Sequence, residues 1–437
     1  MKYFIKTFGC QMNEHDSEII AGLLEADGYK LAENLEDAQI IITNTCCVRE
    51  SAENHIWGFL GSLKRLKTAN PNIVLAVCGC MAQQDNMAEK IRAKAKHMDI
   101  IIGTFQQHRL PEYIAEVIGG NTPIIDVMGA NEDLPNTLPV ARQGKNKAQI
   151  NIIYGCNNYC SYCIVPYVRG PERSRPPEAI IAEVEDLAEA GYKEIMLLGQ
   201  NVNSYGKDLP GVMDFAGLLV CLNQIKGIER IRYMTSHPRD FDRKLVDVIK
   251  DSPKICPHFH LPIQSGSDKI LTLMNRGYDT AFYYDLLQYI KTEMPHASIT
   301  TDLIVGFPGE TEKDFAEGLS FIEKCRFDVA YTFLYSKRSG TPAATMENQV
   351  EMAERKLRLQ RLMDIQNPIS LQINKNLIGK NLKVLVEGVS KTSSDTYTGR
   401  TDTNKVVIFN GREDLVGSIV DVQITQAKTW HLIGKLL

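Results

Sequence analysis

The chain has 437 residues, which suffice for about two to four domains, and its formal net charge of −4 excludes a globally basic surface for nucleic acid. No apolar run reaches the roughly 18 residues of a membrane span, so we expect no membrane partner. Met1–Thr7 enters a strand-like segment at once and lacks the apolar core of a signal peptide. Eleven cysteines, an odd number, therefore indicate a cytoplasmic protein that uses thiols for metal or redox chemistry rather than for disulfides.

The first part of the chain, residues 1–116, alternates predicted strands and helices, which is typical of a parallel sheet covered by helices. The apolar runs Ile40–Ile42 and Ile73–Val77 suit strands that are buried on both faces. Residues 119–146 show little periodicity and are predicted to be a linker. The predicted strands are 2–7, 39–44, 73–78 and 99–102, and the predicted helices are about 14–27, 49–68, 82–95 and 106–118.

Cys10, Cys46 and Cys80 each follow the carboxyl end of one of the first three predicted strands. In an open parallel sheet these ends lie side by side, at the edge where ligands bind. From the residues alone, the pattern fits either a site of three converging thiolates or three scattered core cysteines. Cys47 competes with Cys46 for a place in such a site, whereas Cys78 ends an apolar strand and is expected in the core.

Residues 147–340 repeat six strand–helix units, too few for an eightfold barrel. This periodicity fits both an open barrel and a doubly wound sheet. The predicted strands lie near 148–154, 193–198, 229–234, 258–263, 297–305 and 328–335, and the predicted helices include 177–190, 213–225, 279–294 and 310–325.

The last part of the chain begins with a charged amphipathic helix over 348–373, expected to break near Pro368. Strand-like segments separated by turns follow and predict a small β-barrel of about 60 residues. We expect Tyr397 and Trp430 to pack in its core, and stacking on a base of RNA is the alternative. The predicted strands are Leu382–Val386, Val406–Phe409 and Ile419–Ile424.

Cys156, Cys160 and Cys163 form a C-x3-C-x2-C motif directly after the predicted strand 148–154. Three thiolates on one tight loop can hold three irons of a [4Fe–4S] cluster and leave the fourth iron open to a small molecule. A structural zinc site would need a fourth Cys or His, and none follows at the usual spacing. The polar residues between the cysteines are unlike a core strand, so the motif predicts a cluster site.

This motif resembles that of the radical S-adenosylmethionine (SAM) enzymes, in which the open iron binds SAM and one electron cleaves it to a 5′-deoxyadenosyl radical. The resemblance implies an open (β/α)6 barrel whose strand ends contact SAM. Arg169, Arg173 and Arg175, just after the motif, fit either contacts to phosphate or carboxylate or a solvated charged loop. The implied SAM contacts are Gln200, Ser236, Gln264, Ile304, Gly306 and Glu310.

The whole chain resembles the methylthiotransferases of the radical SAM class. This resemblance implies an α/β fold of three domains: an N-terminal parallel-sheet domain (1–116), a radical SAM core with a trailing helix (147–373) and a small TRAM β-barrel (374–437). It also implies a second, auxiliary [4Fe–4S] cluster on Cys10, Cys46 and Cys80. One SAM molecule would then donate a methyl group to sulfur, and another would give the radical.

Four segments resemble the branch of this family that methylthiolates C2 of N6-isopentenyladenosine at position 37 of tRNA. Threonylcarbamoyladenosine in tRNA and an aspartate of a ribosomal protein are the alternative substrates. A further alternative for the function of the chain is a non-catalytic iron–sulfur protein that binds RNA. The implied partners are a tRNA anticodon stem-loop, an electron donor such as a flavodoxin or ferredoxin, and a sulfur or cluster delivery system. The four segments are Gly9–Ser17, Cys163–Arg175, Met274–Tyr278 and Tyr397–Lys405.

The predicted C-terminal barrel carries several basic residues, but acidic residues dilute them, so composition alone is weak evidence for RNA binding. These basic residues are Lys391, Arg400, Lys405, Arg412 and Lys428.

Overall fold

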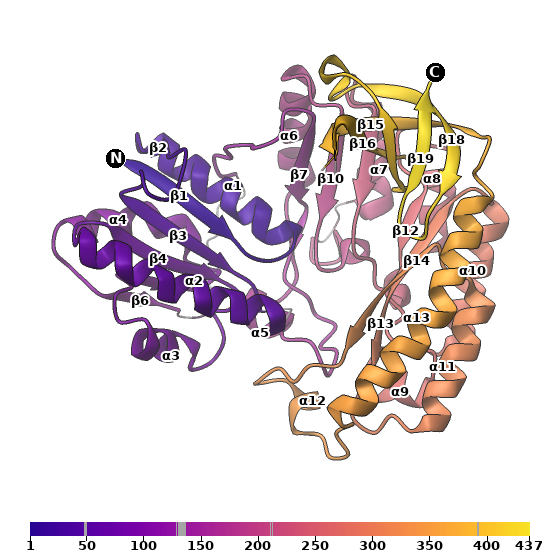
Figure 1. Ribbon diagram of the computed structural model, residues 1–437, viewed down its shortest axis with the longest axis horizontal. Helices are drawn as coiled ribbons and strands as arrows, with labels where there is room; N and C mark the ends of the chain where they lie inside the picture. The colour runs from indigo at the N-terminus through magenta and orange to yellow at the C-terminus, as the bar shows by residue number, and fades with distance from the viewer. Residues whose placement is uncertain (48–49, 128, 130–136, 210, 212, 391–392) are drawn as a thin grey trace. The chain divides into compact units, whose positions relative to one another are not determined.

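The computed structural model describes residues 1–47, 50–127, 129, 137–209, 211, 213–390 and 393–437, so Lys391 lies outside the described residues. The chain forms two compact units (Figure 1). The first unit contains Met1–Gly144, Gln149–Ala179 and Ser336–Ala344, and the second contains Lys145–Ala148, Ile180–Tyr335 and Thr345–Leu437. The C-x3-C-x2-C loop therefore belongs to the same unit as the N-terminal sheet.

The first unit is built on a six-stranded sheet in the order β2-β1-β3-β4-β5-β6, in which all neighbouring strands are parallel. This confirms the predicted parallel sheet. Its strands are β1 (Lys2–Thr7), β2 (Lys30–Leu31), β3 (Ile40–Thr45), β4 (Val74–Gly79), β5 (Ile100–Ile102) and β6 (Ile124–Asp126). Its helices are α1 (Gln11–Ala26), α2 (Glu50–Ala69), α3 (Met87–Lys94) and α4 (Leu110–Ile118).

The sheet is buried on both faces, since helices cover each of them. Successive side chains of a strand point to opposite faces and therefore pack in different apolar clusters. Leu75 and Val77 of β4 pack in one apolar cluster with side chains of α2 and α3. Val74, Ala76 and Cys78 pack in the cluster on the other face, with side chains of α1 and α4. Cys78 is a core residue, as expected.

The predicted linker 119–146 is partly wrong, because Ile124–Asp126 adds a strand to the sheet. The Tyr113 hydroxyl donates to the Asp126 carboxylate at 2.5 Å and helps to hold this edge strand in place. A strand of three residues has too little periodicity to be recognised in a sequence. The helix predicted from residue 82 begins only at Met87, after Asn86, which has a left-handed backbone (φ 58°).

The second unit contains the parallel pair β10–β11 and the parallel three-stranded sheet β12-β13-β14. The strands are β10 (Glu194–Leu198), β11 (Arg230–Tyr233), β12 (His258–His260), β13 (Ser298–Val305) and β14 (Val329–Leu334). The helices are α7 (Phe215–Gln224), α8 (Arg243–Lys250), α9 (Asp268–Leu273), α10 (Thr280–Glu293), α11 (Glu312–Cys325) and α13 (Met352–Lys375). Strand β7 (Lys147–Asn151) and helix α6 (Pro177–Glu189) each contain residues of both units.

Helix α13 runs without a break through Pro368, so the expected interruption is wrong. Ile369 and Ser370 are buried, and the Gln366 amide donates to Phe327 O at 2.9 Å and to Ser370 Oγ at 3.0 Å. The stabilisation from tertiary packing therefore outweighs the cost of the backbone hydrogen bond that is lost at Pro368.

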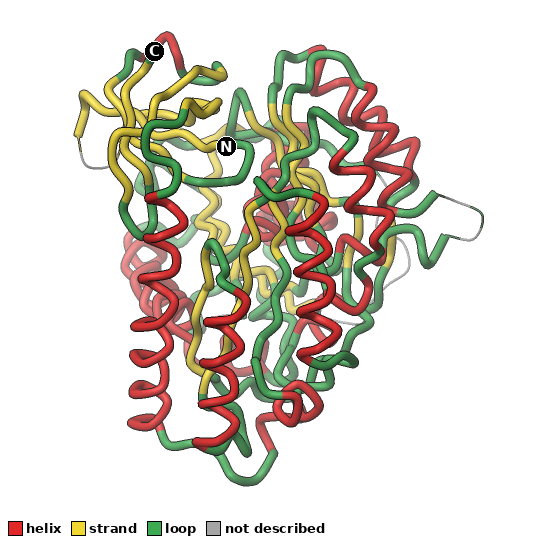
Figure 2. Tube along the Cα trace, turned by 90° about the vertical axis from the view of Figure 1, so that its right-hand side faces the viewer, coloured by secondary structure: helices red, strands yellow, loops and turns green. Residues whose placement is uncertain are grey.

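The C-terminal strands close into a barrel in the order β15-β16-β17-β19-β18, visible as the strands around the C-terminus in Figure 2. Arg230 and Arg232 of β11 hold this barrel by donating to backbone carbonyls, including Lys383 O at 2.8 Å and Thr401 O at 2.6 Å. Two of its strands, β16 and β19, were not predicted. The five strands are β15 (Asn381–Ser390), β16 (Ser393–Thr401), β17 (Val406–Asn410), β18 (Ile419–Ala427) and β19 (Leu432–Leu436).

Over the described ranges, none of the helices has both the length and the apolar character needed to cross a bilayer.

Candidate functional site

Cys10, Cys46 and Cys80 lie at neighbouring strand ends of the first unit. Cys46 and Cys80 follow β3 and β4, which pair in parallel, and Cys80 N donates to Thr45 O at 2.9 Å. Cys10 precedes α1, and a Cβ added to Gly9 would stand 2.7 Å from Cys46 Cβ. The three cysteines thus occupy adjacent turns at one edge of the sheet, although no three Cys, His, Asp or Glu side chains of the described residues are already arranged around one metal position.

A buried amide network supports these turns. Asn13 Nδ2 donates to Thr45 O at 2.9 Å, and Asn44 Nδ2 donates to Ser17 Oγ at 2.9 Å. The Cys10 thiol is 3.5 Å from Asn13 Oδ1. Sequence reasoning missed both asparagines, whose only signal was an amide in each of two cysteine-containing turns.

The surroundings of Cys80 favour a thiolate. The hydrogen bond from Cys47 and the charge of Arg169 lower the pKa of Cys80, against the opposing effect of burial. The same hydrogen bond and burial raise the pKa of Cys47, and burial raises the pKa of Cys78. Cys80, whose sulfur lies 3.2 Å from Arg169 Nε, is therefore better suited to bind a cation than Cys78, since the thiolate is the metal ligand.

The loop with Cys156, Cys160 and Cys163 folds tightly in the same unit. Gly155 has φ +70°, and a side chain there would collide with the Pro171 carbonyl. Cys163 N donates to Cys160 O at 2.9 Å, and Cys156 N donates to Gly170 O at 3.1 Å. This geometry keeps three thiols on one compact loop, as a cluster with one open iron requires.

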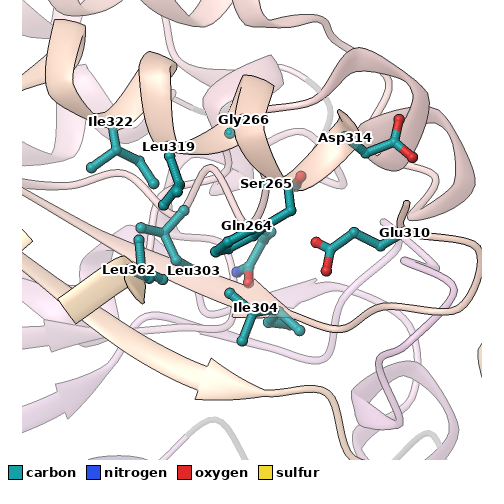
Figure 3. A pocket seen from close by; sticks show the side chains of 13 residues that line it. Gln264, Ser265, Gly266, Leu303, Ile304, Glu310, Asp314, Leu319, Ile322 and Leu362 are labelled. Atoms are coloured by element: carbon teal, nitrogen blue, oxygen red, sulfur yellow. The ribbon is translucent and has the colours of Figure 1, made fainter. Parts of the chain in front are cut away.

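The predicted SAM contacts lie in the second unit, and three of them, Gln264, Ile304 and Glu310, line one pocket (Figure 3). Its empty space is about 280 Å³, including the part open to solvent. Gly306 N donates to the Glu310 carboxylate at 2.7 Å, and Arg358 donates to it at 2.8 Å. Glu310 thus supports the turn after β13, with its carboxylate held by the protein itself.

Gln200 and Ser236 do not line this pocket; they follow β10 and β11. The two loops are joined because His237 N donates to Asn201 Oδ1 at 3.0 Å. Three of their buried polar atoms have no hydrogen-bond partner: Ser236 Oγ, Asn203 Oδ1 and His237 Nε2. Such atoms are rare in folded proteins unless a ligand or water satisfies them, so these loops fit a polar ligand such as SAM. Asn203 and His237 are not among the SAM contacts predicted from the sequence.

Burial makes His237 neutral, with a pKa lowered to about 2 from the ordinary 6.5. Between these values the unfolded chain binds a proton that the folded chain does not, so stability is lost as the pH falls below about 6.5. We expect His237→Asn to reduce this loss by up to about 1.4 kcal/mol per pH unit in urea unfolding measured at pH 7, 6 and 5. His296→Asn, at an exposed site, should follow the parent protein, and parallel loss in the parent and His237→Asn would contradict the assignment.

Three family models match consecutive parts of the chain. They are Uncharacterized protein family UPF0004 over residues 2–103, the Radical SAM superfamily over 150–322 and the TRAM domain over 375–437.

Relatives named tRNA-2-methylthio-N(6)-dimethylallyladenosine synthase match the chain along its whole length. The protein of Pelotomaculum thermopropionicum is 53% identical, with 100% of this chain and 97% of the relative covered. The protein of Thermoanaerobacter pseudethanolicus is 52% identical, with coverages of 100% and 92%.

Solved structures share the fold at low sequence identity. The radical SAM methyltransferase TsrM from Kitasatospora setae, with cobalamin and a [4Fe–4S] cluster, has a TM-score of 0.57 at 12% identity and covers 78% of this chain and 74% of its own. The cobalamin-dependent SAM radical enzyme OxsB has a TM-score of 0.53 at 12% identity, with coverages of 84% and 57%.

Proposed function

This chain belongs to the radical SAM family of tRNA-2-methylthio-N(6)-dimethylallyladenosine synthases, and we propose that it transfers a methylthio group to C2 of N6-isopentenyladenosine 37 in tRNA. The observation that carries the proposal is the 53% identity to a relative of that name over 436 residues. Both cysteine sets and all three domain types of this family are present in the chain.

In this proposal Cys156, Cys160 and Cys163 hold the [4Fe–4S] cluster that binds SAM, and Cys10, Cys46 and Cys80 hold the auxiliary cluster. When bound, the clusters and SAM supply the electron, the radical, the methyl group and the sulfur that this C–H to C–S conversion needs. The donor sets fit, since one offers three thiols on a single tight loop and the other offers three thiols on adjacent turns, and no fourth Cys or His follows the C-x3-C-x2-C motif at zinc spacing.

The protein's own part is to bind and orient. The loops after β10 and β11 offer buried polar atoms to SAM, and Gly155 keeps the cysteine loop compact. Adenosine 37 would have to be turned out of the anticodon stack, at a cost of a few kcal/mol, to be reached.

We place tRNA against the C-terminal barrel, but we expect few of the basic residues named above to contact the RNA, because several of them are already paired with carboxylates. Arg400, Lys405 and Arg412 each form an ion pair, with Glu387, Asp328 and Asp414. Tyr397 is buried in the barrel core as expected, whereas Trp430 is 55% exposed, so its predicted core position is wrong. An exposed indole on a small barrel is suited to stack on a base of single-stranded or looped RNA.

The reaction also consumes an electron and a sulfur atom. The proposal therefore includes a flavodoxin or ferredoxin as electron donor and a sulfur or cluster delivery system as partners.

The test is an anaerobic assay of the reconstituted protein with SAM, dithionite and an anticodon stem-loop carrying isopentenyladenosine 37. Mass spectrometry of the digested nucleosides should show a new 2-methylthio product, and the same stem-loop with unmodified adenosine should give none. Formation of 5′-deoxyadenosine without this product, together with product on a threonylcarbamoyladenosine stem-loop or on the ribosomal protein, would overturn the proposed substrate.

A further inference from the structure

One buried arginine joins the elements that carry the two cysteine sets. Helix α5 (Val165–Arg169) begins two residues after Cys163 and ends at Arg169, which is only 9% exposed. Its Nε lies 3.2 Å from Cys80 Sγ, and its Nη2 donates to Asp16 Oδ2 at 2.7 Å. All these residues belong to the first unit. For Arg169, the expected solvated loop position is therefore wrong, whereas the expected contact to a tRNA phosphate or a SAM carboxylate stays a prediction.

The neighbouring arginines behave differently. Arg175 Nη1 donates to Asn151 O at 2.8 Å, and the Arg173 guanidinium lies over the Tyr154 ring at 5.2 Å from its centroid. Arg169, by contrast, donates to the sulfur of a predicted cluster cysteine.

The pair of Arg169 and Asp16 is fixed by its burial. Asp16 is 5% exposed and stands on α1, the helix that begins directly after Cys10. A planar guanidinium held by a carboxylate on one side keeps its remaining N–H groups in one direction, here toward the Cys80 sulfur. Removing either partner would leave a buried charge unpaired, so the arrangement is rigid.

A hydrogen bond to a ligand sulfur acts on the cluster that this sulfur binds. Reduction adds negative charge to the cluster and its thiolates, and a nearby cationic donor stabilises that charge. Loss of the donor should therefore make the cluster harder to reduce.

We propose that Arg169 is a positioning residue of the auxiliary cluster, which orients Cys80, raises the reduction potential of the cluster and links its site to the SAM-cluster loop through α5. The inference rests on the proposed function, in that Cys10, Cys46 and Cys80 must hold this cluster.

The test isolates the auxiliary cluster in the full chain. Cys156→Ala, Cys160→Ala and Cys163→Ala together remove the other cluster, and the protein is reconstituted anaerobically with iron and sulfide. Arg169→Gln and Arg169→Lys are then compared with Arg142→Gln. Arg142 is a matched control because it also pairs with a carboxylate of α1, Glu18 at 3.1 Å, and donates to Gln149 O.

The first readout is a redox titration with dithionite followed by electron paramagnetic resonance. Arg169→Gln should lower the ratio of reduced to oxidised cluster about tenfold at a given potential, which corresponds to about 59 mV for one electron. Arg169→Lys, which keeps the charge but not the planar fork, should fall between, and Arg142→Gln should match the parent.

The second readout is direct. In protein labelled with ¹⁵N-arginine, pulsed electron paramagnetic resonance of the reduced cluster should show a weakly coupled nitrogen, which is lost in Arg169→Lys and kept in Arg142→Gln.

Equal potentials for the parent and both Arg169 variants would overturn the inference, as would a ¹⁵N coupling that survives in Arg169→Lys. If Arg169→Gln holds no cluster, the inference is decided by whether the reduction potential of Arg169→Lys is lower than that of the parent or equal to it. A parent background that holds no cluster at all would instead overturn the assignment of Cys10, Cys46 and Cys80.

Discussion

Replacement of Cys156 by alanine is expected to abolish both SAM cleavage and methylthiolation. Cys156 stands first in the three-thiol loop and is buried between Gly155 and the amide of Asn158, whose Nδ2 lies 3.4 Å from Cys156 Sγ. A loop with two thiols cannot hold the cluster that binds SAM, so no radical forms. Because catalysed rates exceed uncatalysed ones by about 10⁶ or more, product should fall below detection. Chromatography of 5′-deoxyadenosine and mass spectrometry of nucleosides measure the two activities.

Cys221→Ala provides the control for Cys156→Ala. Cys221 is a half-buried cysteine of α7, and its sulfur lies 3.9 Å from Met213 Sδ. This variant should keep both activities and the full iron content. SAM cleavage at the parent rate in Cys156→Ala would exclude the three-thiol loop as the SAM-cluster site.

Replacement of Cys10 by alanine is expected to separate the two activities. The loop of Cys156, Cys160 and Cys163 stays intact, so 5′-deoxyadenosine should still form. The methylthio product should vanish, because the sulfur is delivered from the site that Cys10 helps to build. Iron content should fall from about eight to about four per chain, the difference of one [4Fe–4S] cluster.

Cys78→Ala is the matched control for Cys10→Ala. Cys78 lies two residues before Cys80, but its side chain packs in the core cluster on the opposite face of the sheet from Cys80. Its removal should cost stability through a small cavity and leave the product and the iron content unchanged. Product at the parent level in Cys10→Ala, or loss of four irons in Cys78→Ala, would contradict the assignment.

The same assay decides between Cys46 and Cys47. Cys47 is buried in the same hydrophobic core cluster as Cys80 and shares a hydrogen bond with Cys80, whereas Cys46 directly follows β3. We expect Cys46→Ala to behave like Cys10→Ala and Cys47→Ala to keep product. The reverse result would exchange the two ligands.

The positions of the central strands could be predicted because buried parallel strands are continuous apolar runs. The predicted strands 39–44 and 73–78, which contain these runs, differ by one residue at each end from β3 and β4. Short edge strands such as β2 and β6 were missed, since two or three residues carry no periodicity. Pro368 was misjudged because its local cost is outweighed by burial of the residues around it.

The candidate site divides in the same way. The spacing of Cys156, Cys160 and Cys163 is a local property, and a tight loop with three thiols can be recognised without any fold. The placement of Cys10, Cys46 and Cys80 at adjacent turns depends on parallel pairing between strands, which the sequence only predicts and the sheet shows.

By itself, the sequence determined the elements whose signals are local: the buried strands, the cysteine motif and the family to which the chain belongs. Only the tertiary structure decided that Arg169 is buried against Cys80 and Asp16, that Glu310 is held by Arg358, and that Trp430 is exposed. The physical reason is that the environment of a long polar side chain is set by neighbours far away in the sequence. Arg169 contacts a carboxylate 153 residues before it in the chain, and no local sequence pattern reveals a contact between residues so far apart.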